Sequence, residues 1–142
     1  MPINLRVSGG LPTGVWDELA ARQASLALAA LVQGRAFDRG VGSDDRTHKA
    51  YSVRYSAFRK RRGYQVSPPN LTRTGRMRRS FRVLAVSADG ATLGLSGEPE
   101  VYGHFVQQAR PWMAPSPSDR DALAKAMPTI VRGAIRRHRR AE

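Results

Sequence analysis

Cysteine is absent from the 142-residue chain, which excludes both a disulfide framework and thiol catalysis. Long apolar runs are missing too, because the most apolar stretch, residues 24–32, is far shorter than the roughly 20 residues that a membrane span needs. Residues 1–10 lack the basic start, apolar run and small-residue cleavage site of a secretory signal. We therefore expect assembly in a reducing cytoplasm and no membrane role.

Acidic residues are scarce as well, with 11 Asp and Glu against 24 Lys and Arg, and the net charge is +13. Residues 35–86 hold fourteen of these cations and three acids, an excess of +11, and residues 132–142 add +4. Blocks of like charge repel one another, so they require solvent, an acidic partner or nucleic acid around them. The distribution therefore implies a partner for the middle of the chain.

The sequence contains no persuasive catalytic or metal-binding pattern. His48, His104 and His138 lie in three unlike segments, and neither a His-x-x-x-His nor a Cys-based metal spacing occurs. Asp44 and Asp45 stand together without a further carboxylate nearby, which suits a solvated turn better than a magnesium site. We therefore predict no enzymatic activity, no metal and no cofactor.

Two long amphipathic helices are predicted towards the ends of the chain. The first begins at a Thr13 cap and runs to about residue 34. The second begins at Ser116, where Pro117 occupies the first helical position and Asp119 can complete a capping box. Both helices need a second apolar surface on which to pack.

Strand periodicity appears at residues 3–7 and, more clearly, around the turn dipeptide Asp89-Gly90, where residues 81–87 and 91–95 alternate as in a hairpin. Residues 110–113 read as a further strand. We therefore predict an α+β fold in which two long helices pack on a small antiparallel sheet. Its shared core is expected to contain Trp16, Leu19, Leu26, Leu31, Phe81, Val83, Leu93, Leu95, Leu123, Met127, Ile130 and Val131.

A single domain of residues 1–142 is predicted, with a core from residues 1–34 and 80–135, a basic helical arm inserted at 35–79 and a basic tail at 136–142. The arm contains a helix at about 50–62. Its aromatic stripe, which consists of Tyr51, Tyr55 and Phe58, is too narrow to anchor the helix in the core of a monomer. We expect the arm to dock on another subunit through Tyr51, Tyr55, Phe58, Arg59, Lys60, Arg61, Arg62, Arg76 and Arg79.

The same charge admits contact with nucleic acid, for which the expected residues are Arg59, Arg61, Arg62, Arg136 and Arg137. No zinc finger, helix-turn-helix or RNA-binding signature accompanies them, so base-specific reading is not expected. Acidic protein surfaces around Glu98 and Glu100 of a neighbouring copy would satisfy the arginines equally well. The two interpretations stay open at the level of sequence.

Five short motifs follow one another along the chain. They are FDRGVGSD at 37–44, AYSVRYSAFR at 50–59, NLTRTGRM at 70–77, VYGHFVQQ at 101–108, and RPWM at 110–113 leading into SPSD at 116–119. In this order, over roughly residues 25–135, the chain resembles phage virion morphogenesis and tail-completion proteins. Its high arginine content and Gly103, where that family commonly has alanine, depart from the pattern.

The resemblance implies a structural subunit of the phage neck or upper tail, acting by ring assembly at the head-to-tail junction and without an active site. The implied partners are further copies of the chain, in a hexameric or dodecameric ring, and other neck and tail proteins, with non-specific contact to phage DNA. Alternatives are a tail terminator, a basic DNA-binding accessory protein of packaging, or a small phage nuclease. The nuclease would need a carboxylate cluster, which the sequence lacks.

Overall fold

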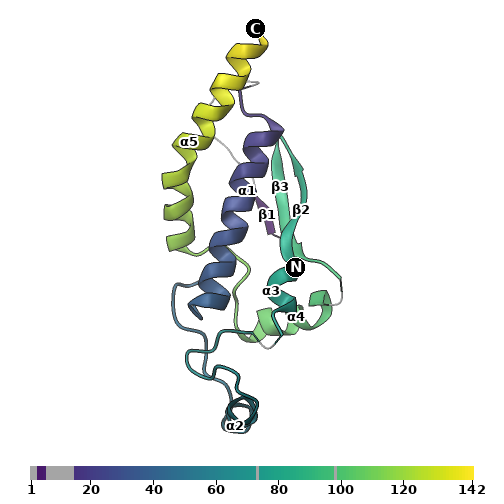
Figure 1. Ribbon diagram of the computed structural model, residues 1–142, viewed down its shortest axis with the longest axis vertical. Helices are drawn as coiled ribbons and strands as arrows, with labels where there is room; N and C mark the ends of the chain where they lie inside the picture. The colour runs from purple at the N-terminus through teal and green to yellow at the C-terminus, as the bar shows by residue number, and fades with distance from the viewer. Residues whose placement is uncertain (1–2, 6–14, 73, 98) are drawn as a thin grey trace.

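A small sheet, helix α1 and helix α5 form three successive layers in the computed structural model, which describes residues 3–5, 15–72, 74–97 and 99–142 (Figure 1). The predicted α+β class is confirmed. The elements in chain order are β1 (Ile3–Leu5), α1 (Glu18–Gln33), the π-helical turn η1 (Gly34–Asp38), α2 (Val53–Arg61), α3 (Arg76–Ser80), β2 (Phe81–Ser87), β3 (Gly90–Leu95), α4 (Pro99–Ala109) and α5 (Pro117–Ala141).

The predicted hairpin is present as β2 and β3, which pair antiparallel, and β1 pairs with the other edge of β3. The register shifts between Val83 and Ala85, so Leu84 is the extra residue of a β-bulge. A one-residue shift turns the following side chains to the opposite face of a strand. For this reason Val86, and not Ala85, packs against the core.

Helix α1 covers one face of the sheet, and α5 packs against α1. The N-cap of α1 is Asp17, whose carboxylate accepts a hydrogen bond from the Ala20 N–H at 2.8 Å, while the predicted Thr13 cap lies outside the described residues. Small side chains such as Ala24 and Ser25 on the buried face allow the neighbouring layers to come close. Because α5 packs on α1, only α1 packs extensively on the sheet. The sequence had predicted that both long helices would pack on the sheet.

Two of the predicted core residues are wrong. Leu19 is 45% exposed and Leu26 is 54% exposed, because they lie on a strip of α1 that neither the sheet nor α5 covers. Phe81, Leu93 and Leu95 are buried as predicted. The remaining predicted residues are half-buried: Trp16, Leu31, Val83, Leu123, Met127, Ile130 and Val131.

The segment predicted as an arm begins later than expected, because its first residues belong to the core. Helix α1 continues into η1, where the Arg39 N–H donates to the Gly34 carbonyl at 3.0 Å, as in a π-helix. Arg35, Ala36 and Phe37 are all buried in this turn. A π-helical turn contains about one residue more than an α-helical turn, so it rotates these three side chains towards the interior of the protein.

Trp112 lies at the centre of the core and is fully buried. Its ring contacts Phe37 edge-on at a centroid distance of 4.9 Å and Phe81 at 5.1 Å. The strand predicted at 110–113 is wrong, because the N–H groups of Trp112 and Met113 donate to the side-chain carbonyl of Gln107, at 2.9 and 3.0 Å. The side-chain amide of Gln107 therefore accepts the backbone hydrogen bonds that a neighbouring strand would otherwise accept.

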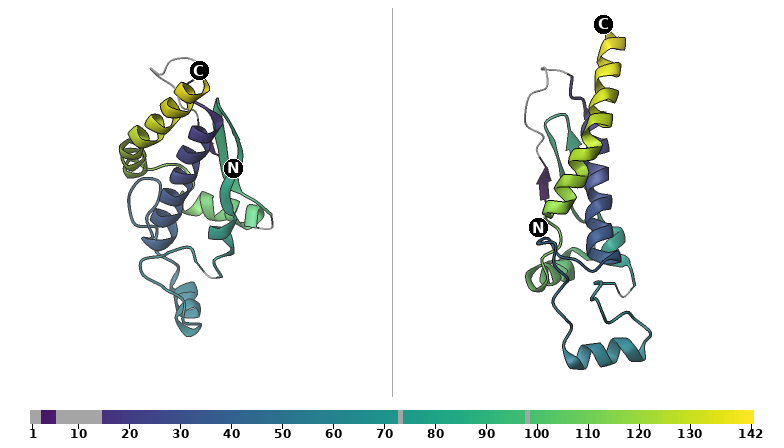
Figure 2. Two further views of the ribbon diagram at one scale, coloured as in Figure 1. Left: turned by 45° about the horizontal axis from the view of Figure 1, so that its top comes forward. Right: turned by 90° about the vertical axis from the view of Figure 1, so that its left-hand side faces the viewer.

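Helix α5 starts with the predicted capping box, in which the Ser116 hydroxyl accepts from the Asp119 N–H and the Asp119 carboxylate accepts from the Ser116 N–H. It passes through Pro128 without interruption, and the predicted tail at 136–142 forms its last turns. Figure 2 shows α5 running alongside α1 and continuing past it towards the C-terminus.

Helix α4 lies beside α3 and β3, and Gly103 faces Leu95 of β3 and Met77 of α3. A Cβ atom on Gly103 would collide with the buried side chain of Leu95 and would meet the sulfur of Met77 at 3.5 Å. A side chain at position 103 would therefore require Leu95 to move.

Candidate functional site

The site predicted from the sequence is the arm, which the structure places at residues 49–72. Its helix α2 lies at the opposite end of the molecule from the C-terminus, beyond the other elements, joined to them by the chain on either side (Figure 1). Ser52 caps α2 by accepting a hydrogen bond from the Tyr55 N–H at 3.2 Å. The helix ends at Arg61, before the left-handed residue Gly63.

Arg59 is the centre of the arm and is only 1% exposed. Its guanidinium donates to the carbonyls of Gln65 and Thr72, both at 2.7 Å, and to the side-chain oxygen of Asn70 at 3.2 Å. One side chain therefore ties α2 to the returning chain. A segment with little apolar surface of its own is folded here around a polar centre.

Aromatic rings surround this guanidinium. The ring centroids of Tyr51, Tyr64 and Tyr55 lie 4.8, 5.5 and 5.8 Å from it, within cation–π range. The Tyr51 hydroxyl also accepts a hydrogen bond from the Leu71 N–H at 3.1 Å. The aromatic stripe predicted from the sequence is thus present, and one of its members, Tyr51, stabilises the arm from inside.

Contacts at Arg110 and at Gly40 help to join the arm to the rest of the protein. Arg110, which follows α4, donates to the carbonyls of Lys49 and Ala50 at 2.7 and 2.9 Å. The returning chain passes Gly40, where a Cβ would lie 2.6 Å from the Pro69 carbonyl oxygen, and Gly40 also has a φ of +66°. Only glycine allows both this backbone conformation and this approach.

A hollow of about 740 Å³ lies between the arm and the body of the protein. Arm side chains line one side, and residues of α3 and α4 line the other. The lining is apolar and cationic, with no acidic residue: Tyr51, Ser52, Tyr55, Arg59, Tyr64, Leu71, Thr74, Gly75, Arg76, Met77, Val106 and Arg110.

The structure brings the predicted interface residues together only in part. Tyr55 is 38% exposed and stacks on the half-buried Phe58 at a centroid distance of 5.9 Å. The outer side of α2 is cationic, with Lys60 and Arg61 exposed, and Arg62 follows them. Arg59 differs from these neighbours, because its guanidinium is occupied within the arm.

The predicted cations outside the arm lie on other elements. Arg76 and Arg79 are exposed on α3, where Arg79 donates to the Thr74 carbonyl at 3.3 Å. Arg136 is exposed on α5, at the far end of the molecule from α2. Arg137 is on the same helix and binds the Asp17 carboxylate at 2.7 and 2.8 Å. The five expected DNA-contacting arginines therefore do not form one surface.

The ion pair with Arg137 changes the pKa of Asp17. The hydrogen bond from Arg137 lowers the pKa of Asp17 to about 2, and the same bond raises the pKa of Arg137. Asp17 also caps α1, so one carboxylate connects the start of α1 to the end of α5. Of the acidic surface suggested as a docking partner, Glu98 and the side chain of Glu100 lie outside the described residues.

Sequence reasoning missed a buried ion pair. Arg35 and Asp119 are 0% and 1% exposed, and the Arg35 Nε lies 2.8 Å from the Asp119 carboxylate. The other guanidinium nitrogens donate to the carbonyls of Val41, Trp112 and Ala114 at 2.8 to 3.0 Å. The capping box identified Asp119, but nothing in the pattern indicated that an arginine 84 positions earlier would reach it.

Asp45 also has a partner that the sequence did not suggest. Its carboxylate accepts hydrogen bonds from the N–H and hydroxyl of Ser118 in the first turn of α5, and these bonds lower the pKa of Asp45. Asp44 and Asp45 lie in an exposed turn, as expected, and Asp45 also connects this loop after η1 to α5. Burial lowers the pKa of His48 in the same loop, and its ring lies 3.1 Å from the Ala36 carbonyl.

Within the part of the chain that the structure describes, no three His, Asp or Glu residues come together as a metal site would require. No helix in these ranges is long and apolar enough to cross a membrane. Comparison with known proteins found no matching family model, no matching curated protein and no matching solved structure.

Proposed function

We propose that this protein is a structural subunit of the neck of a tailed bacteriophage, of the tail-completion type, which assembles into a ring at the head-to-tail junction and performs no catalysis. The observation that carries the proposal is the arm, an ordered helical projection with its own polar centre. The motif order from residue 37 to residue 119 supports the same class of protein.

The arm has the properties of a docking element. Arg59 and Arg110 hold its helix and its base in one conformation, so a partner would not have to order it on binding. Its outer side exposes Val53, which is 90% exposed, beside the cations of α2. An exposed β-branched residue contributes nothing to the isolated chain, whereas a neighbouring subunit could bury it.

The body of the protein offers a second uncovered surface, the strip of α1 that carries Leu19 and Leu26. An exposed apolar strip on a central helix is typical of a surface that another subunit covers. Two different surfaces on one chain fit a heterologous contact, which closes into a ring when the rotation between subunits permits. A tail terminator would use the same geometry at a different station in the particle.

The test uses Val53→Asp, which places a charge on the outer side of the arm. An acidic residue in the first turn of a helix is favourable, so α2 should remain folded. Ala88→Asp, in the exposed turn between β2 and β3, is the matched control with the same charge change. We expect the wild type and the control to form rings and to enter particles, and Val53→Asp to remain monomeric.

The measurements are sedimentation velocity of the purified proteins, alone and with other neck proteins of the same phage, and incorporation into particles in a complementation assay. A wild-type chain that never oligomerises and never enters particles would refute the proposal. Normal rings from Val53→Asp would show that the arm's outer side is not the contact. Thermal unfolding of both variants checks that the fold is retained.

A further inference from the structure

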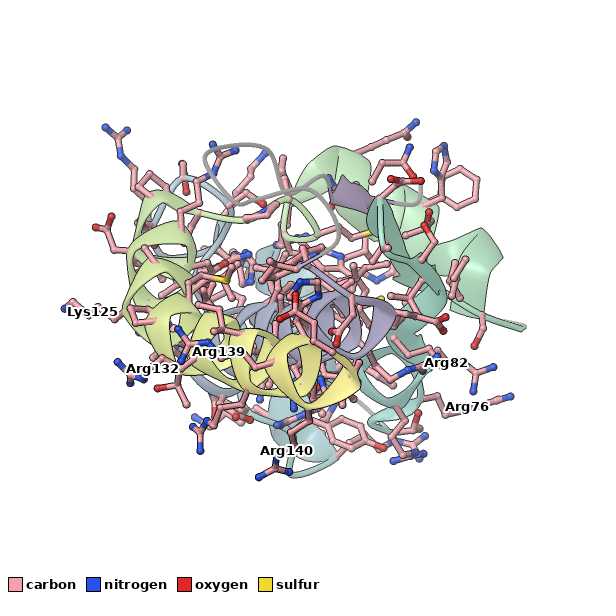
Figure 3. All side chains as sticks on the ribbon, turned by 90° about the horizontal axis from the view of Figure 1, so that it is seen from above. Arg76, Arg82, Lys125, Arg132, Arg139 and Arg140 are labelled. Atoms are coloured by element: carbon pink, nitrogen blue, oxygen red, sulfur yellow. The ribbon has the colours of Figure 1, made fainter. Side chains whose placement is uncertain are left out.

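Helix α5 carries a row of cations on the face turned away from α1. Figure 3 shows Lys125, Arg132 and Arg139 pointing outwards along this helix, with Arg140 near its end. All members of the row are exposed, and between residues 122 and 141 the helix contains no acidic residue. We call the row the α5 cation stripe, and it consists of Lys125, Arg132, Arg136, Arg139 and Arg140.

The stripe is straight and regular. At about 100° per residue, its members fall within an arc of about 100° on the helix, and at 1.5 Å per residue they extend over roughly 22 Å. Lys125, Arg132 and Arg139 are spaced seven residues apart, so they repeat about every 10 Å along the same line. A polyanion with closely spaced charges could meet every member of such a row.

The rest of α5 fixes the direction in which the stripe faces. Ala134 is buried against Val15 and Ala20, and Ile130 and Ile135 pack beside them, so the apolar side of the helix is turned to α1. Arg137 lies on this inner side and binds Asp17, which excludes it from the stripe. The stripe is therefore presented by a helix whose inner side is held against α1 between residues 130 and 137.

Neither the helix dipole nor an apolar contact with a membrane or a protein explains the whole stripe. Cations in the last turn of a helix interact favourably with its dipole, which covers Arg139 and Arg140 but not Lys125 or Arg132. A membrane-surface helix or a protein interface would need large apolar side chains next to the cations. On α5 the exposed residues between them are small or polar, such as Thr129 and Pro128.

We infer that the α5 cation stripe binds the phosphate backbone of double-stranded DNA without reading its bases. The guanidinium groups and the ammonium contact phosphates, and no aromatic or amide side chain accompanies them to discriminate between bases. The inference is independent of ring assembly. It moves the DNA contact from the arginines expected from the sequence to a different set, of which only Arg136 is shared.

The experiment measures binding of the purified protein to two fluorescent 24-base-pair DNA duplexes of unrelated sequence, at salt concentrations from 50 to 200 mM. Five phosphate contacts predict a slope of about −4.5 in the plot of log K against log salt, or a loss of roughly 500-fold over this range. The triple variant Lys125→Gln, Arg132→Gln and Arg139→Gln should have a slope of about −1.8 and lose only about 12-fold.

A second triple variant with the same charge loss, Arg54→Gln, Lys60→Gln and Arg61→Gln on the arm, is the matched control and should keep the wild-type slope. Equal loss of slope in both variants would overturn the inference, since net charge alone would then explain binding. Preferential binding of polyglutamate over DNA would also overturn it and indicate an acidic protein partner. Unchanged oligomerisation of the stripe variant separates this outcome from a failure of assembly.

Discussion

Replacing Arg35 with methionine removes the charge that Asp119 faces in the interior of the protein. Arg35 and Asp119 are 0% and 1% exposed, and no other cation in the described residues forms an ion pair with Asp119. Three carbonyls, on the loop after η1 and on the chain before α5, lose their guanidinium donors at the same time. The substitution therefore disturbs three segments that meet at one point.

Removing one member of a buried ion pair costs about 3 to 5 kcal/mol, because the remaining charge is left unpaired in a poorly solvated site. A domain of this size unfolds with an entropy of about 0.3 kcal/mol/K, so a loss of about 4 kcal/mol lowers Tm by about 13 °C. Since the total stability of a domain is about 5 to 15 kcal/mol, the variant should be folded only marginally.

Urea unfolding followed by tryptophan fluorescence measures the loss, because Trp112 lies in the core beside this site. The companion variants are Asp119→Asn and the double variant. The double variant should be more stable than Arg35→Met alone, because no unpaired charge remains in it. A cost below about 1 kcal/mol for Arg35→Met, or simple additivity in the double variant, would refute the reasoning.

Three further predictions concern the packing and titration of single residues. Asp17→Asn keeps an N-cap but loses the ion pair with Arg137, and since a third of the Asp17 side chain is exposed we expect a loss of only about 1 kcal/mol at pH 7. Because the folded pKa of Asp17 is depressed to about 2, this contribution is complete above pH 4 to 5 and disappears as the pH falls towards 2, which urea midpoints against pH will show. Burial lowers the pKa of His48, so the wild type should lose stability as the pH falls below about 6.5, and a His48→Gln variant should lose that pH dependence. Leu28→Ala should cost about 2 to 5 kcal/mol and Leu26→Ala less than about 1 kcal/mol, and equal losses in urea unfolding would contradict the packing of α1.

The sequence predicted those parts of the fold whose signals are local. The hairpin follows from alternation around Asp89-Gly90, and the start of α5 follows from the Ser116 capping box. Both depend on residues within a few positions of one another. The inward turn of Arg35 could not be predicted in this way, because its partners come from 84 positions further along the chain.

The buried face of α1 could not be assigned correctly from the sequence either. Leucines and alanines surround most of this helix, so periodicity alone placed Leu26 in the core when it lies on the uncovered strip. For the site, the sequence predicted a basic arm with an aromatic stripe, and the structure has both. It could not predict that Arg59 is buried at the arm's centre, since the geometry depends on carbonyls of the returning chain at residues 65 and 72.

The internal roles of Arg35, Arg59 and Arg110 have a consequence for which cation can occupy each of these positions. Each guanidinium forks between two or more carbonyls, a geometry that lysine cannot reproduce with its single nitrogen. The chain has 21 arginines and three lysines. At these three joints the charge alone is therefore not enough, because the ammonium group of a lysine would not reach all the carbonyls that one guanidinium spans.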